Sequence, residues 1–212
     1  MEWIVTTIFT GTAAFVATNI DDIFVLMLFY SQLSATFRRR HVVAGQYLGF
    51  AALVAISLLG FLGSLVVPRE WIGLLGLLPI AIGIRKFIRQ HETIEKEEFK
   101  RLERQSSKSS LLAGLLSWQT LSVVTVTFAN GGDNIGIYVP LFASSNLARL
   151  SAILSTFFVL LAVWCYIGYL FARHPAVANI LPRYAHSIVP FVFIALGVYI
   201  LIENETLKLL GL

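Results

Sequence analysis

The chain has 212 residues, of which 57% are hydrophobic and only 13% charged, and its mean hydropathy is +0.79. A soluble domain carries about 25% charged residues, so half of the usual polar surface is missing and a soluble fold is excluded. The single cysteine, Cys165, excludes an internal disulfide and a cysteine-rich metal cage. The net charge of +4 does not indicate nucleic-acid binding, because the basic residues lie where the loops of a membrane protein need them.

Apolar segments long enough to cross a bilayer, which takes about 20 residues, follow one another along the chain. We predict helices over 4–33, 42–67, 71–88, 111–143, 150–171 and 188–202. The first segment has no basic start and is too long for a secretory signal peptide. The sequence therefore predicts an all-α integral membrane protein with six transmembrane helices.

The basic residues of this six-helix arrangement fall mainly on one side. Thirteen of the 16 Lys and Arg residues, Lys86 among them, belong to the first, third and fifth loops or to the helix ends that enter them. Only Arg69, Arg149 and Lys208 belong to the other side. Basic loops stay in the cytoplasm, so we expect both termini outside and the charged loop 90–110 inside.

Two short motifs, 17–23 and 129–135, match at an offset of 112 residues and indicate an internal repeat. Asp21 aligns with Asp133 and Asp22 with Asn134, each deep in the first helix of a three-helix half. With three helices per half, the second half has inverted topology, as in many transporters. We divide the chain into a first repeat at 1–90, a cytoplasmic linker at 91–110 and a second repeat at 111–212.

The first and fourth helices are expected to be interrupted at these motifs. Gly131 and Gly132 weaken the fourth helix, and Pro140 can kink it further on. In the first helix, Asn19 is a suitable residue to cap a helix that restarts after Thr18.

All three aspartates of the chain, Asp21, Asp22 and Asp133, lie in these motifs. One ionised Asp at a helix centre costs about 2.5–3.5 kcal/mol on insertion scales, so three cost roughly 8–10 kcal/mol. No Lys or Arg is expected deep in a span to pair with them. The acids are therefore predicted to bind a cation, to be protonated, or both.

The residue types fit a hard divalent cation, which prefers oxygen ligands. Adjacent helical residues point about 100° apart, so only one of Asp21 and Asp22 is expected to face the metal directly. We favour Asp22, together with Asp133. The other candidate ligands carry amides or a hydroxyl, and hydrogen bonding between helices explains them equally well: Asn19, Asn130, Asn134, Thr18 and Gln46.

No phosphate-binding Walker A pattern occurs, and neither a catalytic residue nor a bound cofactor is predicted. Metal-binding acids must be deprotonated, so a cation and protons compete for one site. Exchange of a divalent cation for protons by a secondary transporter follows from this competition.

The residues 18–23, 45–50, 130–138 and 190–191 resemble the CadD family of cadmium-resistance transporters, within the lysine-exporter superfamily. The resemblance spans nearly the whole chain. It implies a six-helix exporter of Cd²⁺, or of other divalent metals, in a bacterial plasma membrane. The oxygen-rich motifs suit Mn²⁺ better than the softer Cd²⁺, so Mn²⁺ stays an alternative substrate.

Other classes of function remain open from the sequence. An exporter of amino acids or organic cations is suggested by the wider superfamily. An intramembrane aspartyl protease needs two aspartates, but a third aspartate and the neighbouring asparagines fit ligation better. A structural protein would tolerate the loss of Asp133. A homodimer also stays open, because Gly73 and Gly76 can pack helices within a chain or between chains.

Overall fold

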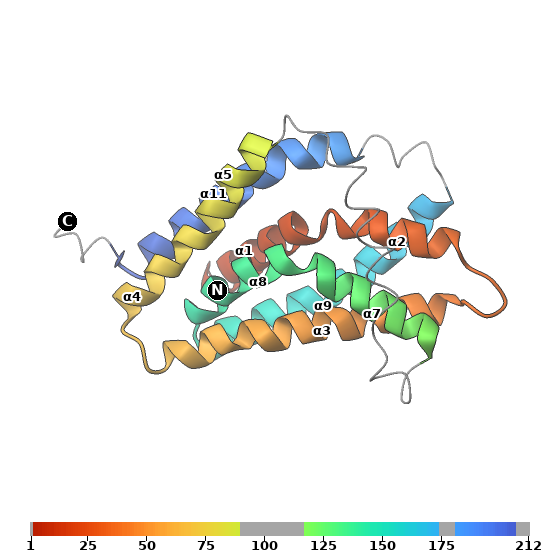
Figure 1. The fold of residues 1–212 in the computed structure, drawn as a ribbon. Helices are drawn as coiled ribbons and strands as arrows, with labels where there is room; N and C mark the ends of the chain where they lie inside the picture. The colour runs from red at the N-terminus through yellow and green to blue at the C-terminus, as the bar shows by residue number, and fades with distance from the viewer. Residues whose placement is uncertain (1, 90–116, 174–180, 207–212) are drawn as a thin grey trace.

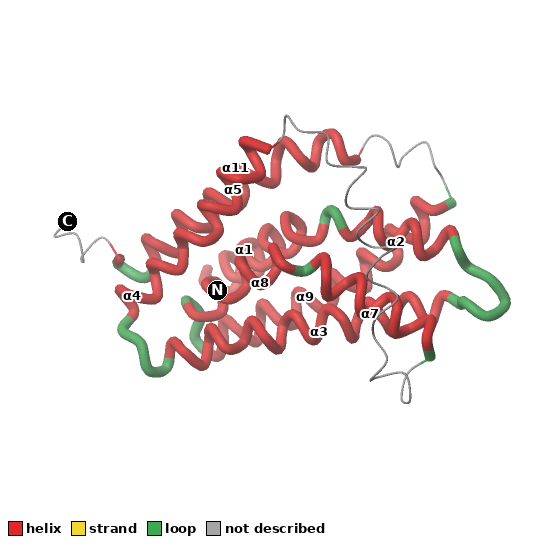
Figure 2. The backbone as a smooth tube through the Cα atoms, viewed as in Figure 1, coloured by secondary structure: helices red, strands yellow, loops and turns green. Residues whose placement is uncertain are grey.

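The computed structural model describes residues 2–89, 117–173 and 181–206, and these parts are helical with short connections (Figure 2). The predicted linker 91–110 lies outside the described residues, as does the start of the predicted helix 111–143. Every predicted helical segment contains helix where it is described. The helices are α1 Glu2–Asn19, α2 Asp22–Ser31, α3 Arg39–Ser64, α4 Arg69–Gly73, η1 Leu74–Gly76, α5 Leu77–Arg89, α7 Trp118–Asn130, α8 Gly132–Ala143, α9 Leu147–Ala172 and α11 Leu181–Glu203.

The lengths and compositions of the helices identify a membrane protein. Among the described residues, Arg39–Ser64, Trp71–Ile88 and Leu147–Ala172 are each long and apolar enough to cross a bilayer. The pair α1 and α2 adds a fourth crossing if the two are counted as one bent span. The all-helical class is thus confirmed with three to four candidate spans, and the six-span inverted arrangement stays a prediction.

The first predicted helix is broken beside the aspartates. It turns by 57° between α1 and α2, with Ile20 and Asp21 in the connection. The expectation that Asn19 caps the second piece is wrong, because Asn19 is the last residue of α1 and its Nδ2 donates to the Phe15 carbonyl oxygen at 2.8 Å. Asp21 occupies the cap position of α2 without a side-chain hydrogen bond to that helix end, so its carboxylate is free for other partners.

The fourth predicted helix is broken at the predicted glycines. α7 ends at Asn130, α8 begins at Gly132, and Gly131 lies between them. A Cβ atom at residue 131 would overlap the side chain of Leu53 on α3. Glycine therefore allows α3 to pass closely at the point where the helix is interrupted.

The helices pack in three groups (Figure 1). α9 packs along α1 and α2, α3 packs along α7 and α8, and α5 packs along α11. Between the first two groups, fully buried rings of Phe15, Phe50, Tyr138 and Phe157 form an aromatic core with centroids 4.6–6.1 Å apart. Gly73 and Gly76 pack against the end of α11 in the same chain, so they give no support to a dimer.

Because α3 approaches α7 closely at Gly45, a larger residue at this position is predicted to destabilise the protein. A Cβ atom there would lie 2.8 Å from the Thr120 carbonyl oxygen, whereas a Cβ atom at Gly63 on the same helix meets nothing within 4 Å. Gly45→Ala should lower the free energy of unfolding by about 1–3 kcal/mol through overpacking. Gly63→Ala, the matched control, should leave it unchanged or raise it by up to about 1 kcal/mol. Thermal melts of both variants in detergent check this, and equal melting temperatures would contradict the close packing.

Candidate functional site

The two helix breaks bring Asp21 and Asp133, which the predicted repeat aligns, to one ammonium group. Lys86 Nζ, from α5, lies 3.3 Å from Asp21 Oδ2 and 2.8 Å from Asp133 Oδ2. The three side chains are 27%, 37% and 41% exposed, respectively, so the cluster is partly open rather than sealed in the core. Carboxylates from the two halves of the chain thus share a single cationic partner.

This arrangement corrects the expectation that no basic residue reaches the aspartates. The sequence places Lys86 at a helix end that enters a basic cytoplasmic loop. Here α5 packs along α11, and Lys86 Nζ lies 5.3 Å from the centroid of the buried Phe193 ring on α11. The lysine is directed into the protein because two acids there offset the cost of removing its charge from water.

Asp22 lies apart from the Lys86 cluster, in a buried amide environment. Only 5% of the residue is exposed, and its Oδ1 accepts a hydrogen bond from Asn130 Nδ2 at the end of α7. Gln46 of α3 also lies beside this carboxylate. Of the two adjacent aspartates, Asp22 is therefore the buried one and Asp21 the one paired with lysine.

Gln46 is buried with one end of its amide unused. It is 1% exposed, Thr127 Oγ1 donates to its Oε1 at 2.7 Å, and its Nε2 has no hydrogen-bond partner. The Thr127 hydroxyl can donate or accept, so the amide can turn over and present its oxygen instead. In the structure the atom without a partner is the amide nitrogen, a hydrogen-bond donor, and the side chain lies beside the Asp22 carboxylate.

Three other predicted ligands, Thr18, Asn19 and Asn134, form a hydrogen-bonded network with Tyr138. Asn19 Nδ2 donates to the Tyr138 hydroxyl at 2.8 Å, Thr18 Oγ1 lies 2.8 Å from the same hydroxyl, and Asn134 Nδ2 donates to Asn19 Oδ1 at 3.2 Å. Trp164 Nε1 donates to the Asn19 carbonyl oxygen at 2.8 Å. This network joins α1 to α8, and Trp164 links it to α9. For these three predicted ligands, the structure contains the interhelical hydrogen bonds that the sequence left as an alternative.

The sequence interpretation missed Lys86, Tyr138 and Trp164. A signal for Tyr138 existed, because it follows Asn134 by four residues and so lies on the same helix face. No comparable signal points to Trp164. Within the described parts of the chain, no group of three or more His, Cys, Asp or Glu side chains is close enough to hold a metal. The carboxylates are instead divided between Lys86 and Asn130.

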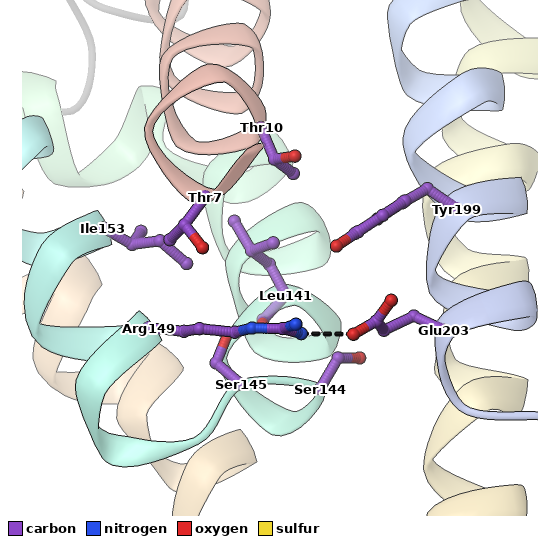
Figure 3. A pocket seen from close by; sticks show the side chains of 9 residues that line it. All are labelled: Thr7, Thr10, Leu141, Ser144, Ser145, Arg149, Ile153, Tyr199 and Glu203. Carbon is purple, nitrogen blue, oxygen red and sulfur yellow. Dashed lines mark hydrogen bonds and ion pairs between the residues drawn. The ribbon is translucent and has the colours of Figure 1, made fainter. Parts of the chain in front are cut away.

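A separate pocket lies at the other end of α8 (Figure 3). It is bounded by the start of α1, the start of α9 and the end of α11, and an ion pair between Arg149 and Glu203 crosses it. Hydroxyl groups of Thr7, Ser144 and Tyr199 also face it. None of the predicted site residues lines this pocket.

Comparison with known families decides the class of the protein. A family model described as cadmium resistance transporter matches residues 15–211, which include both breaks and Lys86. The chain belongs to the cadmium resistance transporter family. The resemblance noted in the two motifs is thereby confirmed. No curated protein and no solved structure gives a significant match to this chain.

Membership of the cadmium resistance transporter family gives the polar site its context. The protein is a transmembrane transporter associated with resistance to cadmium, and the family implies a metal ion as its substrate.

The Tyr138 hydroxyl joins α8 to α1, so its removal is predicted to lower the stability of the protein. Tyr138→Phe leaves Asn19 Nδ2 and Thr18 Oγ1 without their shared buried partner. The free energy of unfolding should fall by about 1–3 kcal/mol. Tyr166→Phe is the matched control, because Tyr166 is 62% exposed. Denaturant titrations in detergent measure both, and an equal effect of the two substitutions would argue against a structural role for the network.

Proposed function

We propose that this chain is a secondary transporter that exports divalent metal cations, Cd²⁺ first among them, in exchange for protons. The observation that carries the proposal is the pairing of Asp21 and Asp133 with one ammonium group, because acids from two helix breaks that share one cation can share another. Asp22 and Asp133 are the proposed principal carboxylate ligands. Asp21, Asn130 and Gln46 complete the proposed site.

The packing pattern supports two inverted halves. Under the repeat, α1 and α2 correspond to α7 and α8, α3 corresponds to α9, and α5 corresponds to α11. The packing of α9 on α1 and α2 then has its counterpart in the packing of α3 on α7 and α8, and the contact of α1 with α8 has its counterpart in the contact of α2 with α7. A site at the junction of two such halves is typical of alternating-access transporters.

The distribution of basic residues supports both termini facing outward. Lys86 turns to the aspartates and leaves the cytoplasmic set, which falls from 13 residues to 12 against three on the other side. The asymmetry remains large, and basic loops are retained in the cytoplasm. The direction of transport proposed here is from the side of the basic loops to the side of the termini.

Proton exchange follows from the chemistry of the acids. A carboxylate that holds a metal must be deprotonated, and the same carboxylate in an apolar environment is cheapest when neutral. Metal and protons therefore replace each other as the neutralising partner. A site that alternates its exposure between the two sides would then move metal outward and protons inward.

Mn²⁺ is the second candidate substrate, and the ligand set favours it. The proposed ligands are all oxygens, from three carboxylates and two amides, whereas Cd²⁺ binds softer ligands more strongly. The family description favours Cd²⁺. An exporter of organic cations is the more distant alternative, and it would leave the aspartates as its proton site.

Neutralising a proposed ligand should stop transport. In liposomes that contain the purified protein, Asp22→Asn or Asp133→Asn should reduce Cd²⁺ and Mn²⁺ flux at least about tenfold, because a charge in contact with the metal is lost. Membrane insertion should be intact, since neutralisation lowers the cost of a buried acid. Glu2→Gln, at the exposed start of α1, is the control and should transport normally. Normal flux in both aspartate variants would refute the proposed site, and the wild-type ratio of the two fluxes decides between the metals.

Collapse of the proton gradient should slow export if protons are exchanged. Metal flux is measured in the same liposomes with an imposed pH gradient and after addition of a protonophore, which removes the driving force of proton entry. Uptake or release of protons should accompany metal movement. Flux that is indifferent to the gradient would reject proton coupling and would leave the metal site itself untouched.

A further inference from the structure

We propose that Lys86 is a tethered monovalent cation that holds Asp21 and Asp133 between transport events and thereby makes the site reject monovalent cations. The lysine would thus determine selectivity by valence. This inference rests on the proposed function, because it concerns the same acids and their cation. It assigns a role to a residue that the ligand set does not contain.

The geometry shows an ion site already filled by a side chain. Lys86 Nζ lies between carboxylate oxygens of the two halves, at 3.3 Å and 2.8 Å, as a small monovalent ion would. The ammonium group is compact, carries one charge and sits on a flexible stem. Because it is attached to the protein, its effective concentration at the site reaches the millimolar range or higher and never falls with dilution.

A monovalent ion therefore gains nothing by replacing Lys86. Na⁺ or K⁺ would bring the same single charge, would lose its hydration and would displace the ammonium from both carboxylates. A divalent ion brings twice the charge, and its attraction to each carboxylate doubles at equal distance. Lys86 would therefore be displaced by a divalent cation but not by a monovalent one.

The total formal charge of the site points to the same valence. Asp21 and Asp133 together carry two negative charges, of which Lys86 offsets one. One divalent cation in place of the ammonium group would offset both, whereas one monovalent ion would offset no more than Lys86 already does.

The displaced lysine also has a place to go. The Phe193 ring of α11 already lies 5.3 Å from Nζ and is fully buried. An aromatic face attracts an ammonium group by about 0.5–2 kcal/mol, depending on its exposure to water. A small rotation of the stem would therefore move the charge off the carboxylates and keep it near the face of the aromatic ring. The partial exposure of both carboxylates leaves room for an incoming ion.

The test measures how Na⁺ competes with a divalent ion when Lys86 is changed. Binding of radioactive Cd²⁺ to purified protein in detergent is measured in sodium nitrate and in choline nitrate, both at about 0.15 M so that screening is equal. For the wild type, the exchange of choline for Na⁺ should change the apparent Kd by less than about twofold. Lys86→Met keeps the length of the stem without the charge, and Na⁺ should then weaken Cd²⁺ binding by about tenfold. Lys86→Arg keeps the charge and should still exclude Na⁺.

Chemical rescue separates the charge from effects on folding. Lys86→Cys in a Cys165→Ala background has one thiol, since Cys165 is the only native cysteine. An ethylammonium methanethiosulfonate would restore a positive charge on this thiol, whereas the neutral ethyl reagent would not. Exclusion of Na⁺ should return with the charged reagent alone, in one and the same protein preparation.

The outcomes distinguish this inference from the proposed function. A wild type that binds neither Cd²⁺ nor Mn²⁺ would overturn both. In another outcome the wild type binds Cd²⁺ and excludes Na⁺, and Lys86→Met and both adducts of Lys86→Cys exclude Na⁺ equally well. This outcome would overturn the role of Lys86 and would leave the proposed metal site standing. Competition by Na⁺ in Lys86→Met and in the neutral adduct, but not in the charged adduct, would establish valence selection by the lysine.

Discussion

Three carboxylates among apolar helices must be compensated, and most features of this structure follow from how that is done. Asp21 and Asp133 are compensated by Lys86, and Asp22 is compensated by amides rather than by a cation. Removing an isolated charge from water costs several kcal/mol or more, so neither arrangement is a minor detail of packing. The helix breaks lie beside Asp21 and Asp133, and both acids reach Lys86 from there.

The polar residues near the breaks have two different tasks. Thr18, Asn19, Asn134 and Tyr138 hydrogen-bond to one another and hold α1 against α8, so their polar atoms are already used. The carboxylates and the amide of Gln46 are less fully used. A firm network beside side chains with fewer partners suits the proposed site, because its ligands could change partners while the helices stay in register.

Membership of the cadmium resistance transporter family implies a metal ion as the substrate, and the proposed ligands bear differently on its identity. Oxygen ligands alone select a hard cation, whereas cadmium binds well to sulfur, and Cys165 is buried on α9 and belongs to neither carboxylate cluster. A tethered lysine adds a discrimination that ligand softness does not provide, namely by charge. Valence and softness are independent, so a site of this kind can reject abundant monovalent ions while accepting several divalent metals.

The sequence by itself determined the class of the protein, the approximate extent of each helical segment and the positions of both breaks. These depend on local properties: long apolar runs, glycines that weaken a helix, and acids that recur at one offset. It also identified Asp21, Asp22 and Asp133 as the charged centre. Only the tertiary structure decided which partner each acid has. Whether Lys86 points to solvent or inward depends on how α5 lies against α11, and whether Asn19 caps a helix or binds Tyr138 depends on the approach of α8. Both are contacts between segments far apart in the chain, and a local pattern carries no information about them.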